Sequence, residues 1–253
     1  MKTSSKEYYS RANVDEKYDD ERFVSLSGKM FSSFEEWIVS SNLPEKRNGM
    51  KLLDVGTGSG RFAIEMAKQG FNVVACDYSQ AMLDTVNRKI EELGLENHIT
   101  LSRQDATELS FDDNTFDFVS CIRVSVNLDT IENVEAALKE LIRVCKPGGR
   151  IVFDIVNPKS LAFFRVNSSN TTSIITLKKA KGLIASIPTV NVEKYCGKRI
   201  VSPLFEKAPA FILKPLDKLD AVLSKYFLSF CIRIYFVLTK QEDKFDGNNK
   251  WTE

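Results

Sequence analysis

Residues 51–60, KLLDVGTGSG, decide the fold of this chain. The apolar residues Leu52, Leu53 and Val55 indicate a buried strand, and three glycines at alternate positions follow it. Residues 61–69 then place apolar side chains at helical spacing. A glycine-rich turn between a strand and a helix is typical of the nucleotide-binding corner of an α/β sheet, because a ligand can approach the bare backbone there.

The composition favours one full-sized domain. The chain has 253 residues, of which 43% are hydrophobic, and that is enough for one substantial core. Its five cysteines are far apart and form no CxxC pair, so we expect buried free thiols in a cytoplasmic protein rather than disulfides or a zinc site. The polar N-terminus is unlike a signal peptide, and no uninterrupted apolar run approaches the ~20 residues that span a bilayer.

Charge is distributed unevenly along the chain. Residues 1–158 carry a net charge of −7, residues 159–240 carry +10, and residues 241–253 carry −2. The basic segment suits an anionic partner such as a phosphorylated substrate, a membrane surface or nucleic acid. A lysine-rich solvated surface explains the same charge equally well, and both interpretations remain open here.

Strands alternate with helices through the first two thirds of the chain. Residues 24–41 predict an amphipathic helix, and Tyr8, Tyr9 and Tyr18 precede it, either to close over a ligand or to anchor the N-terminal arm. After the opening strand, apolar runs predict further strands at 71–76, 98–102, 116–122 and 150–155, with helical patterns between most of them. This alternation predicts a parallel, doubly wound sheet.

The pattern becomes irregular after residue 158. We expect a loop at 166–173, a strand at 189–195, an irregular region around Pro203, Pro209 and Pro215, a helix at 216–226, a strand at 230–239 and a polar tail from 241. The aromatic stretch 226–238, YFLSFCIRIYFVL, favours a buried strand. Contact with a membrane surface is its alternative interpretation.

Acidic residues follow the second and third predicted strands. Asp77 stands 17 residues after Gly60, where an acid in a βαβ unit accepts the hydroxyls of a ribose. Asp105 follows the third strand and is placed to accept from the amino group of an adenine; without this context it would be a turn residue. Met82, in the first turn of the next helix, fits either a ligand contact or a core position.

Four segments in order carry a family likeness. They are LLDVGTGSG at 52–60, VVACDYSQAML at 73–83, QDATELSFDDNTFDFV at 104–119 and LIRVCKPGGRIVFDI at 141–155. Across roughly residues 50–156 the chain resembles the class I S-adenosylmethionine-dependent methyltransferases, especially those acting on small molecules. The glycine spacing argues against the nicotinamide fingerprint GxGxxG, which would need glycine at Arg61, whereas this chain has Gly60.

The resemblance implies a Rossmann-like α/β fold with a seven-stranded sheet ordered 3-2-1-4-5-7-6, in which strand 7 is antiparallel. The 189–195 and 230–239 segments would then be strands 6 and 7. We expect one domain overall, with a helical cap or lid at 1–45, the cofactor-binding core at 46–157, strands 6 and 7 with a substrate-specificity insertion at 158–240, and a polar tail at 241–253.

The resemblance also implies cofactor contacts, with S-adenosyl-L-methionine as cofactor and S-adenosyl-L-homocysteine as its product. The glycine turn and Asp54 would meet the methionine part, Asp77 the ribose, and Tyr78 the adenine, while the segment 121–123 would lie near the sulfonium. The predicted cofactor-binding residues are Asp54, Gly56, Thr57, Gly58, Gly60, Asp77, Tyr78, Met82, Asp105, Ala106, Cys121 and Arg123. No metal ligand and no catalytic residue is predicted.

The expected function is transfer of a methyl group to a small acceptor, anionic or lipid-linked, by in-line displacement. Relatives often carry His-Leu after strand 4, but this chain has Asn127-Leu128 and so lacks a histidine base there. Residues 158–230 match no motif. We expect no nucleic acid partner; a methyltransferase acting on RNA or a membrane-associated substrate through the basic segment is the main alternative. A nicotinamide-dependent oxidoreductase and a non-catalytic cofactor-binding protein are the weaker ones.

Overall fold

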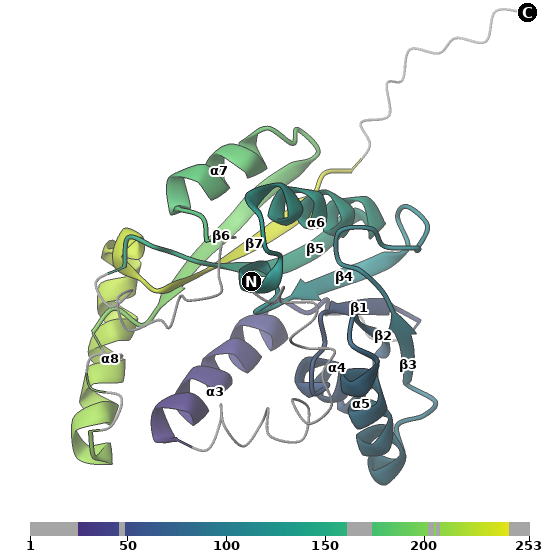
Figure 1. The fold of residues 1–253 in the computed structure, drawn as a ribbon, viewed down its shortest axis with the longest axis horizontal. Helices are drawn as coiled ribbons and strands as arrows, with labels where there is room; N and C mark the ends of the chain where they lie inside the picture. Colours follow the sequence, from purple (N-terminus) through teal and green to yellow (C-terminus); the bar gives the residue numbers. More distant parts are fainter. Residues whose placement is uncertain (1–24, 46–48, 161–173, 202–204, 206–207, 243–253) are drawn as a thin grey trace, which may run out of the picture.

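Seven strands form one sheet in the order β3-β2-β1-β4-β5-β7-β6 (Figure 1). The computed structural model describes residues 25–45, 49–160, 174–201, 205 and 208–242. The strands are β1 Lys51–Val55, β2 Asn72–Asp77, β3 Ile99–Arg103, β4 Phe116–Cys121, β5 Cys145–Val156, β6 Val190–Lys198 and β7 Arg233–Lys240. The helices are α3 Leu26–Ser40, α4 Arg61–Lys68, α5 Gln80–Leu93, α6 Ile131–Val144, α7 Leu177–Ala185 and α8 Ala210–Tyr226, with short 3-10 helices η1 Ser125–Asn127 and η4 Leu228–Phe230.

The first five strands are parallel, and β7 runs antiparallel between β5 and β6. The predicted strand order and the predicted antiparallel strand are therefore confirmed. The glycine-rich turn connects β1 to α4. Its residues reverse the chain direction at the end of β1 and lead into the helix. Gly60, with a φ of 80°, is the N-cap of that helix.

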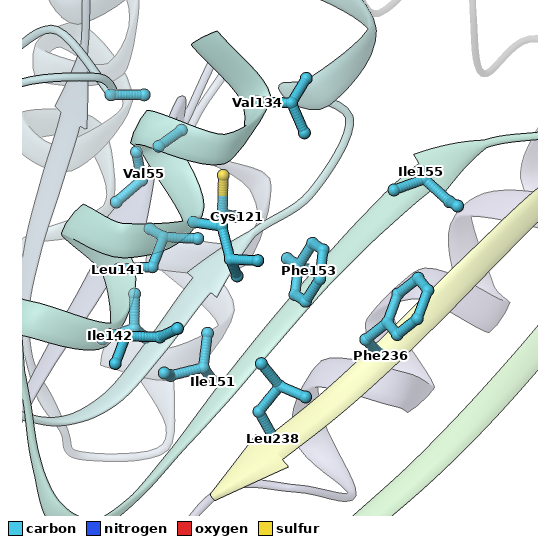
Figure 2. Packing of buried hydrophobic residues seen from close by; sticks show 14 of the residues in the cluster. Val55, Cys121, Val134, Leu141, Ile142, Ile151, Phe153, Ile155, Phe236 and Leu238 are labelled. Carbon is cyan, nitrogen blue, oxygen red and sulfur yellow. The ribbon is translucent and has the colours of Figure 1, made fainter. Parts of the chain in front are cut away.

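Both faces of the sheet are covered by helices. Side chains of a strand alternate between faces, so Leu52 packs with α3, α4 and α5, whereas its neighbour Leu53 packs with α6 and α7. Figure 2 shows the second of these cores, where Leu141 and Ile142 of α6 lie over the strands. In this core the Phe153 and Phe236 rings are stacked with centroids 4.9 Å apart, which fastens β7 to β5.

The aromatic stretch 226–238 divides into two parts. Residues 234–238 of β7 are completely buried, so the predicted buried strand is confirmed there. Tyr226, Phe227 and Phe230 precede the strand and are exposed. Within the described ranges, no helix has both the length and the apolar character needed to cross a membrane.

Several element boundaries differ from the sequence expectations. Residues 146–149, expected as a turn, lie inside β5, where the pairing with β4 shifts register and Gly148 has a φ of 77°. Helix α7 occupies a stretch for which no element was predicted, and α8 begins at Ala210 instead of 216 and continues through Pro215. The expectations for Tyr8, Tyr9, Tyr18, Pro203, the 166–173 loop and most of the tail lie outside the described residues.

Candidate cofactor-binding cleft

A cleft opens at the carboxyl ends of β1, β2 and β4, where ligands bind in open α/β sheets. Its empty space is about 750 Å³, which includes space open to solvent. The lining residues are Val55, Gly56, Gly58, Asp77, Tyr78, Met82, Gln104, Asp105, Ala106, Ile122, Arg123, Val124, Asn127 and Leu128.

Two glycines of the turn form one wall of the cleft. Gly56 and Gly58 have φ angles of 67° and 54°, in the left-handed region that favours glycine. A Cβ atom on Gly56 would lie 2.2 Å from Cγ2 of Val124, so the turn packs directly on the segment after β4. Gly60 does not line the cleft. Glycine allows close packing at this position, because a Cβ atom there would lie 2.8 Å from Val86 of α5.

Asp77 presents a fixed carboxylate at the tip of β2. Its Oδ2 accepts from the Gly58 N–H and its Oδ1 from the Ser79 N–H, both at 2.9 Å. Burial raises the pKa of this carboxyl, while the backbone N–H groups act to lower it. A carboxylate has about four acceptor positions, so two backbone bonds leave each oxygen able to accept a ligand hydroxyl.

The segment after β3 and the start of α5 complete this half of the cleft. Tyr78 stands at the rim, with the Arg103 guanidinium 5.6 Å from its ring centroid. Met82 is buried below it. Asp105 is held in a turn because its Oδ1 accepts from the N–H and the hydroxyl of Thr107. These positions bring an aromatic ring, a thioether and a carboxylate to one end of the cleft.

Asp54 points away from the cleft into the protein. It is only 1% exposed, and it accepts hydrogen bonds of 2.7 Å from the hydroxyls of Thr57 and Ser120. Burial raises its pKa to about 6, although the two hydroxyl bonds act in the opposite direction. The carboxyl thus ties the glycine turn to β4, and neither Asp54 nor Thr57 lines the cleft.

Arg123 lines the cleft but directs its charge toward helix α3. Its φ is 65°, and its N–H donates to Oδ1 of Asp154 at 2.6 Å. Its Nε donates to both carboxylate oxygens of Glu35, at 2.8 and 2.9 Å. Glu35 also bonds Arg61 at 2.7 Å and the Tyr235 hydroxyl at 2.9 Å.

Glu35 is a completely buried carboxylate at the centre of this network. Burial alone would raise its pKa, but the guanidinium groups of Arg123 and Arg61 hold the pKa below its ordinary value. A neighbouring buried pair, Asp154 and Arg233, joins β5 to β7. Sequence reasoning missed Glu35. The signal was its position between Phe31 and Ile38 on the buried face of α3, where a charge requires a partner.

The other half of the cleft is mainly apolar. Ile122, Val124 and Leu128 line it, and Asn127 donates from Nδ2 to the Arg123 carbonyl at 3.1 Å. Cys121 lies outside this lining: it is buried among Val55, Leu141 and Phe153 (Figure 2), and burial raises its pKa well above the ordinary range.

The cleft therefore gathers eight of the twelve predicted residues. These are Gly56, Gly58, Asp77, Tyr78, Met82, Asp105, Ala106 and Arg123. Asp54, Thr57, Gly60 and Cys121 lie behind it and support its walls. Val55, Gln104, Val124 and Leu128 were not among the predicted contacts, although each adjoins a strand end that the sequence had identified.

The strand order and the position of this cleft define the class I methyltransferase fold. The model of the family described as "Methyltransferase domain" matches residues 53–153, the part of the chain that supplies every residue lining the cleft.

Curated relatives match about half of the chain. A demethylmenaquinone methyltransferase from Streptomyces avermitilis is 37% identical over 123 residues, 48% of each chain. One from Bacillus cereus (strain AH187) is 34% identical over 145 residues, which are 55% of this chain and 59% of the relative. The ubiquinone/menaquinone biosynthesis C-methyltransferase UbiE of Idiomarina loihiensis is 36% identical over 110 residues, 42% of each. The chain thus spans about half the length of the curated relatives it matches.

Solved structures share the fold across most of the chain. A geranyl diphosphate C-methyltransferase from Streptomyces coelicolor A3(2), in complex with Mg²⁺, geranyl diphosphate and S-adenosyl-L-homocysteine, has a TM-score of 0.65 and 16% identity, and the match covers 94% of this chain and 90% of that one. The PH0226 protein from Pyrococcus horikoshii OT3 has a TM-score of 0.65 and 18% identity, with coverage of 93% and 99%.

Proposed function

We propose that this protein is an S-adenosylmethionine-dependent methyltransferase that acts on a small, apolar acceptor. The observation that carries the proposal is the Asp77 carboxylate, fixed by two backbone N–H groups at the tip of β2 inside the cleft. An acid held in this way suits the two neighbouring hydroxyls of a ribose, because each of its two oxygens can accept a hydrogen bond from one hydroxyl.

The rest of the cleft fits the remaining parts of this cofactor. Tyr78 and Met82 would flank the adenine, and Asp105 would accept from its amino group beside Ala106. Gly56 and Gly58 would let the methionine part lie against the bare backbone. When bound, S-adenosylmethionine supplies a methyl group on a positively charged sulfur, which keeps the electron pair of the broken carbon–sulfur bond as the acceptor atom attacks in line.

The acceptor half of the cleft carries no evident base among the described residues. The titratable side chains of the lining are Asp77, Tyr78, Asp105 and Arg123, and the first three belong to the nucleoside half. Arg123 is bound to Glu35. We therefore infer that the acceptor attacks with an atom that needs no proton removed by these side chains before it attacks, such as a ring carbon activated by an already ionised ring oxygen. The hydrogen of that carbon then leaves as a proton to water when the ring becomes aromatic again.

The chain's own contribution is then alignment and exclusion of water. Ile122, Val124 and Leu128 form an apolar wall that would pack against an apolar acceptor and keep water from the reacting atoms. The curated relatives named as quinone C-methyltransferases support an acceptor of this chemical kind. A reduced naphthoquinone without its ring methyl group, carried on an isoprenoid tail, is the acceptor to test first.

Calorimetric titration with S-adenosyl-L-homocysteine tests the cofactor assignment. We expect the wild type to bind it and not NADH, and we expect Asp77→Ala to weaken binding by at least about 10- to 100-fold, because a single charge-assisted hydrogen bond already contributes about 1.5–3 kcal/mol. Asp84→Ala is the matched control, because Asp84 is exposed on α5, outside the cleft, and its Oδ1 accepts from Nε2 of the neighbouring Gln80 at 2.8 Å.

Methyl transfer is then measured with the reduced naphthoquinone. A wild type that binds neither S-adenosyl-L-homocysteine nor S-adenosylmethionine would refute the cofactor assignment. Binding that is intact in Asp77→Ala would refute the role of that carboxylate. Tight cofactor binding without transfer to the quinol would leave the cofactor assignment standing and overturn the proposed acceptor.

A further inference from the structure

The outward side of helix α8 carries large apolar residues, where an ordinary surface helix carries polar ones. Phe211 is 76% exposed and Tyr226 is 77% exposed, and Leu219 and Val222 between them are also exposed. At about 100° per residue these four positions lie within a quarter of the helix circumference. The inward side is formed by Leu213, with the buried polar residues Asp220 and Ser224 further along.

The apolar surface continues beyond the end of the helix. Phe227 and Phe230, at the start and end of η4, are exposed and lie with their ring centroids 6.3 Å apart. We call the six residues the α8 face: Phe211, Leu219, Val222, Tyr226, Phe227 and Phe230. Single exposed apolar residues are ordinary, but a continuous group of large ones marks an interaction surface.

Lysines border the α8 face on one side. Lys214, Lys218 and Lys225 are exposed, and their helical positions place them next to Phe211 along the same edge. No exposed position within Ala210–Tyr226, all of them described, carries a carboxylate. Both carboxylates of the helix have partners within the protein. Asp217 forms an ion pair with Lys198 at 2.7 Å, and the buried Asp220 accepts a hydrogen bond from the Val201 N–H.

A second group of lysines adjoins η4. A groove with contributions from Lys159, Lys178 and Lys181 also includes Ser229, which lies in η4 between Phe227 and Phe230 in the sequence. Positive charge therefore flanks the apolar surface at the helix and at its end. This is where part of the +10 net charge of residues 159–240 is placed.

We infer that the α8 face docks on a membrane surface that contains anionic lipids, with α8 lying in the plane of the interface. Aromatic and aliphatic side chains would enter the boundary between headgroups and acyl chains while the bordering lysines bind anionic headgroups. A second copy of the chain fits less well, because it would bring the same lysines to the contact without an exposed carboxylate on α8 to receive them.

The inner side of α8 leads toward the cleft. Leu213 and Asp217 share a small cavity with Phe31 of α3, and the Phe31 ring lies 4.7 Å below the Arg123 guanidinium, which lines the cleft. These contacts connect the inner side of α8 to the Arg123 side of the cleft, not to its nucleoside half. The docking proposal does not depend on methyl transfer, because it rests on the α8 face alone.

Vesicle sedimentation tests the proposal with the full chain. We expect binding to phosphatidylcholine vesicles that contain phosphatidylglycerol and weaker binding to phosphatidylcholine alone. Phe211→Gln combined with Val222→Gln should reduce the affinity by roughly tenfold or more. The matched control is Leu93→Gln, since Leu93 is a large apolar residue that is 47% exposed on α5, away from the α8 face, and its change should leave binding unaltered.

The lysines are tested separately. Lys214→Gln with Lys218→Gln should weaken binding to the anionic vesicles by about fivefold per lysine and leave phosphatidylcholine binding unaltered. Lys68→Gln with Lys139→Gln, on α4 and α6, is the control with the same change of net charge. Thermal unfolding of each variant should match the wild type, since all of these side chains are exposed.

Three results would overturn the docking proposal. The first is no binding of the wild type to anionic vesicles, and the second is equal binding by the Phe211/Val222 variant. The third is a dimer, seen in sedimentation equilibrium, that the Phe211/Val222 variant dissociates, because the α8 face would then bind a second copy. Vesicle binding with no methyl transfer would support docking and count only against the proposed function.

Discussion

Replacing Glu35 by glutamine should destabilise this protein far more than any change at its surface. The substitution keeps the shape of the side chain and removes the negative charge that Arg61 and Arg123 share at 2.7 and 2.8 Å. Removing one member of a buried ion pair costs about 3–5 kcal/mol, and because the two arginines are partly exposed we expect the lower end, about 3 kcal/mol. For a chain of this size that corresponds to a fall in Tm of roughly 6–12 °C.

Glu36→Gln is the matched control for this measurement. Glu36 is the next residue on α3, is 40% exposed, and lies 3.5 Å from the same Arg61, so its loss should cost about 0–1 kcal/mol. Both variants are compared with the wild type in urea unfolding followed by circular dichroism. If Glu35→Gln costs no more than Glu36→Gln, the buried network does not stabilise the docking of α3, and the reasoning is wrong.

The pH dependence gives an independent check on Glu35. Its folded pKa lies below the ordinary value of 4.5, so its stabilising effect is complete above pH 4.5 and is lost as the pH falls through the folded pKa. The stability difference between wild type and Glu35→Gln should therefore be full at neutral pH and shrink in acid. A difference that stays constant down to the acid transition would mean that the charge is not what matters.

Two further predictions concern the glycine turn and its support. The pKa of Asp54 is raised from 3.8 to about 6, so the wild type should lose about 2 kcal/mol of stability relative to Asp54→Asn as the pH rises from 4 to 6, measured by urea unfolding; a difference independent of pH would refute the raised pKa. Gly56→Ala should cost more than Gly94→Ala, because both glycines have left-handed φ angles but only Gly56 would place a Cβ against Val124. The left-handed angle alone costs about 1–2 kcal/mol, so thermal unfolding should show an excess for Gly56→Ala, and equal losses would mean that Val124 moves aside freely.

The core of the fold could be predicted because its signals are local. The strand at 51–55, its glycine turn and the acid at Asp77 lie close together in the sequence, and a parallel sheet brings strand tips to one edge whatever the connecting helices contain. That geometry places Asp77 and Asp105 in one cleft. Their predicted contacts with a cofactor stay predictions.

The same local signals could not distinguish Asp54 from Asp77. Both are aspartates near the end of a buried strand, but a hydroxyl on β4, 66 residues further along the chain, holds Asp54 inside. No sequence pattern near residue 54 indicates that the Ser120 hydroxyl donates to Asp54. Gly60 is a similar case, because the side chain that requires its missing Cβ is Val86 on another helix.

The start of α8 was predicted at residue 216 instead of 210 because Pro215 was taken as the boundary of the helix. Pro215 removes one donor from the helical ladder, but it lies on the exposed side of α8, where water can satisfy the carbonyl that loses its partner. The sequence also made no prediction about which side of α8 faces the core. Amphipathic patterns place apolar residues inward, whereas Phe211, Leu219 and Val222 lie on the outward side of this helix.

The hydrogen bond between Glu35 and Tyr235 joins residues 200 positions apart, and this has a consequence during synthesis on the ribosome. The ribosome adds about 5–20 residues per second, so roughly 10–40 s pass between the synthesis of Glu35 and that of Tyr235. Strand β5 is likewise synthesised before β7, the strand that covers its edge. A nascent chain interrupted before Arg233 contains every residue that lines the cleft. It would nevertheless expose an unpaired sheet edge, which is the surface through which incomplete proteins aggregate.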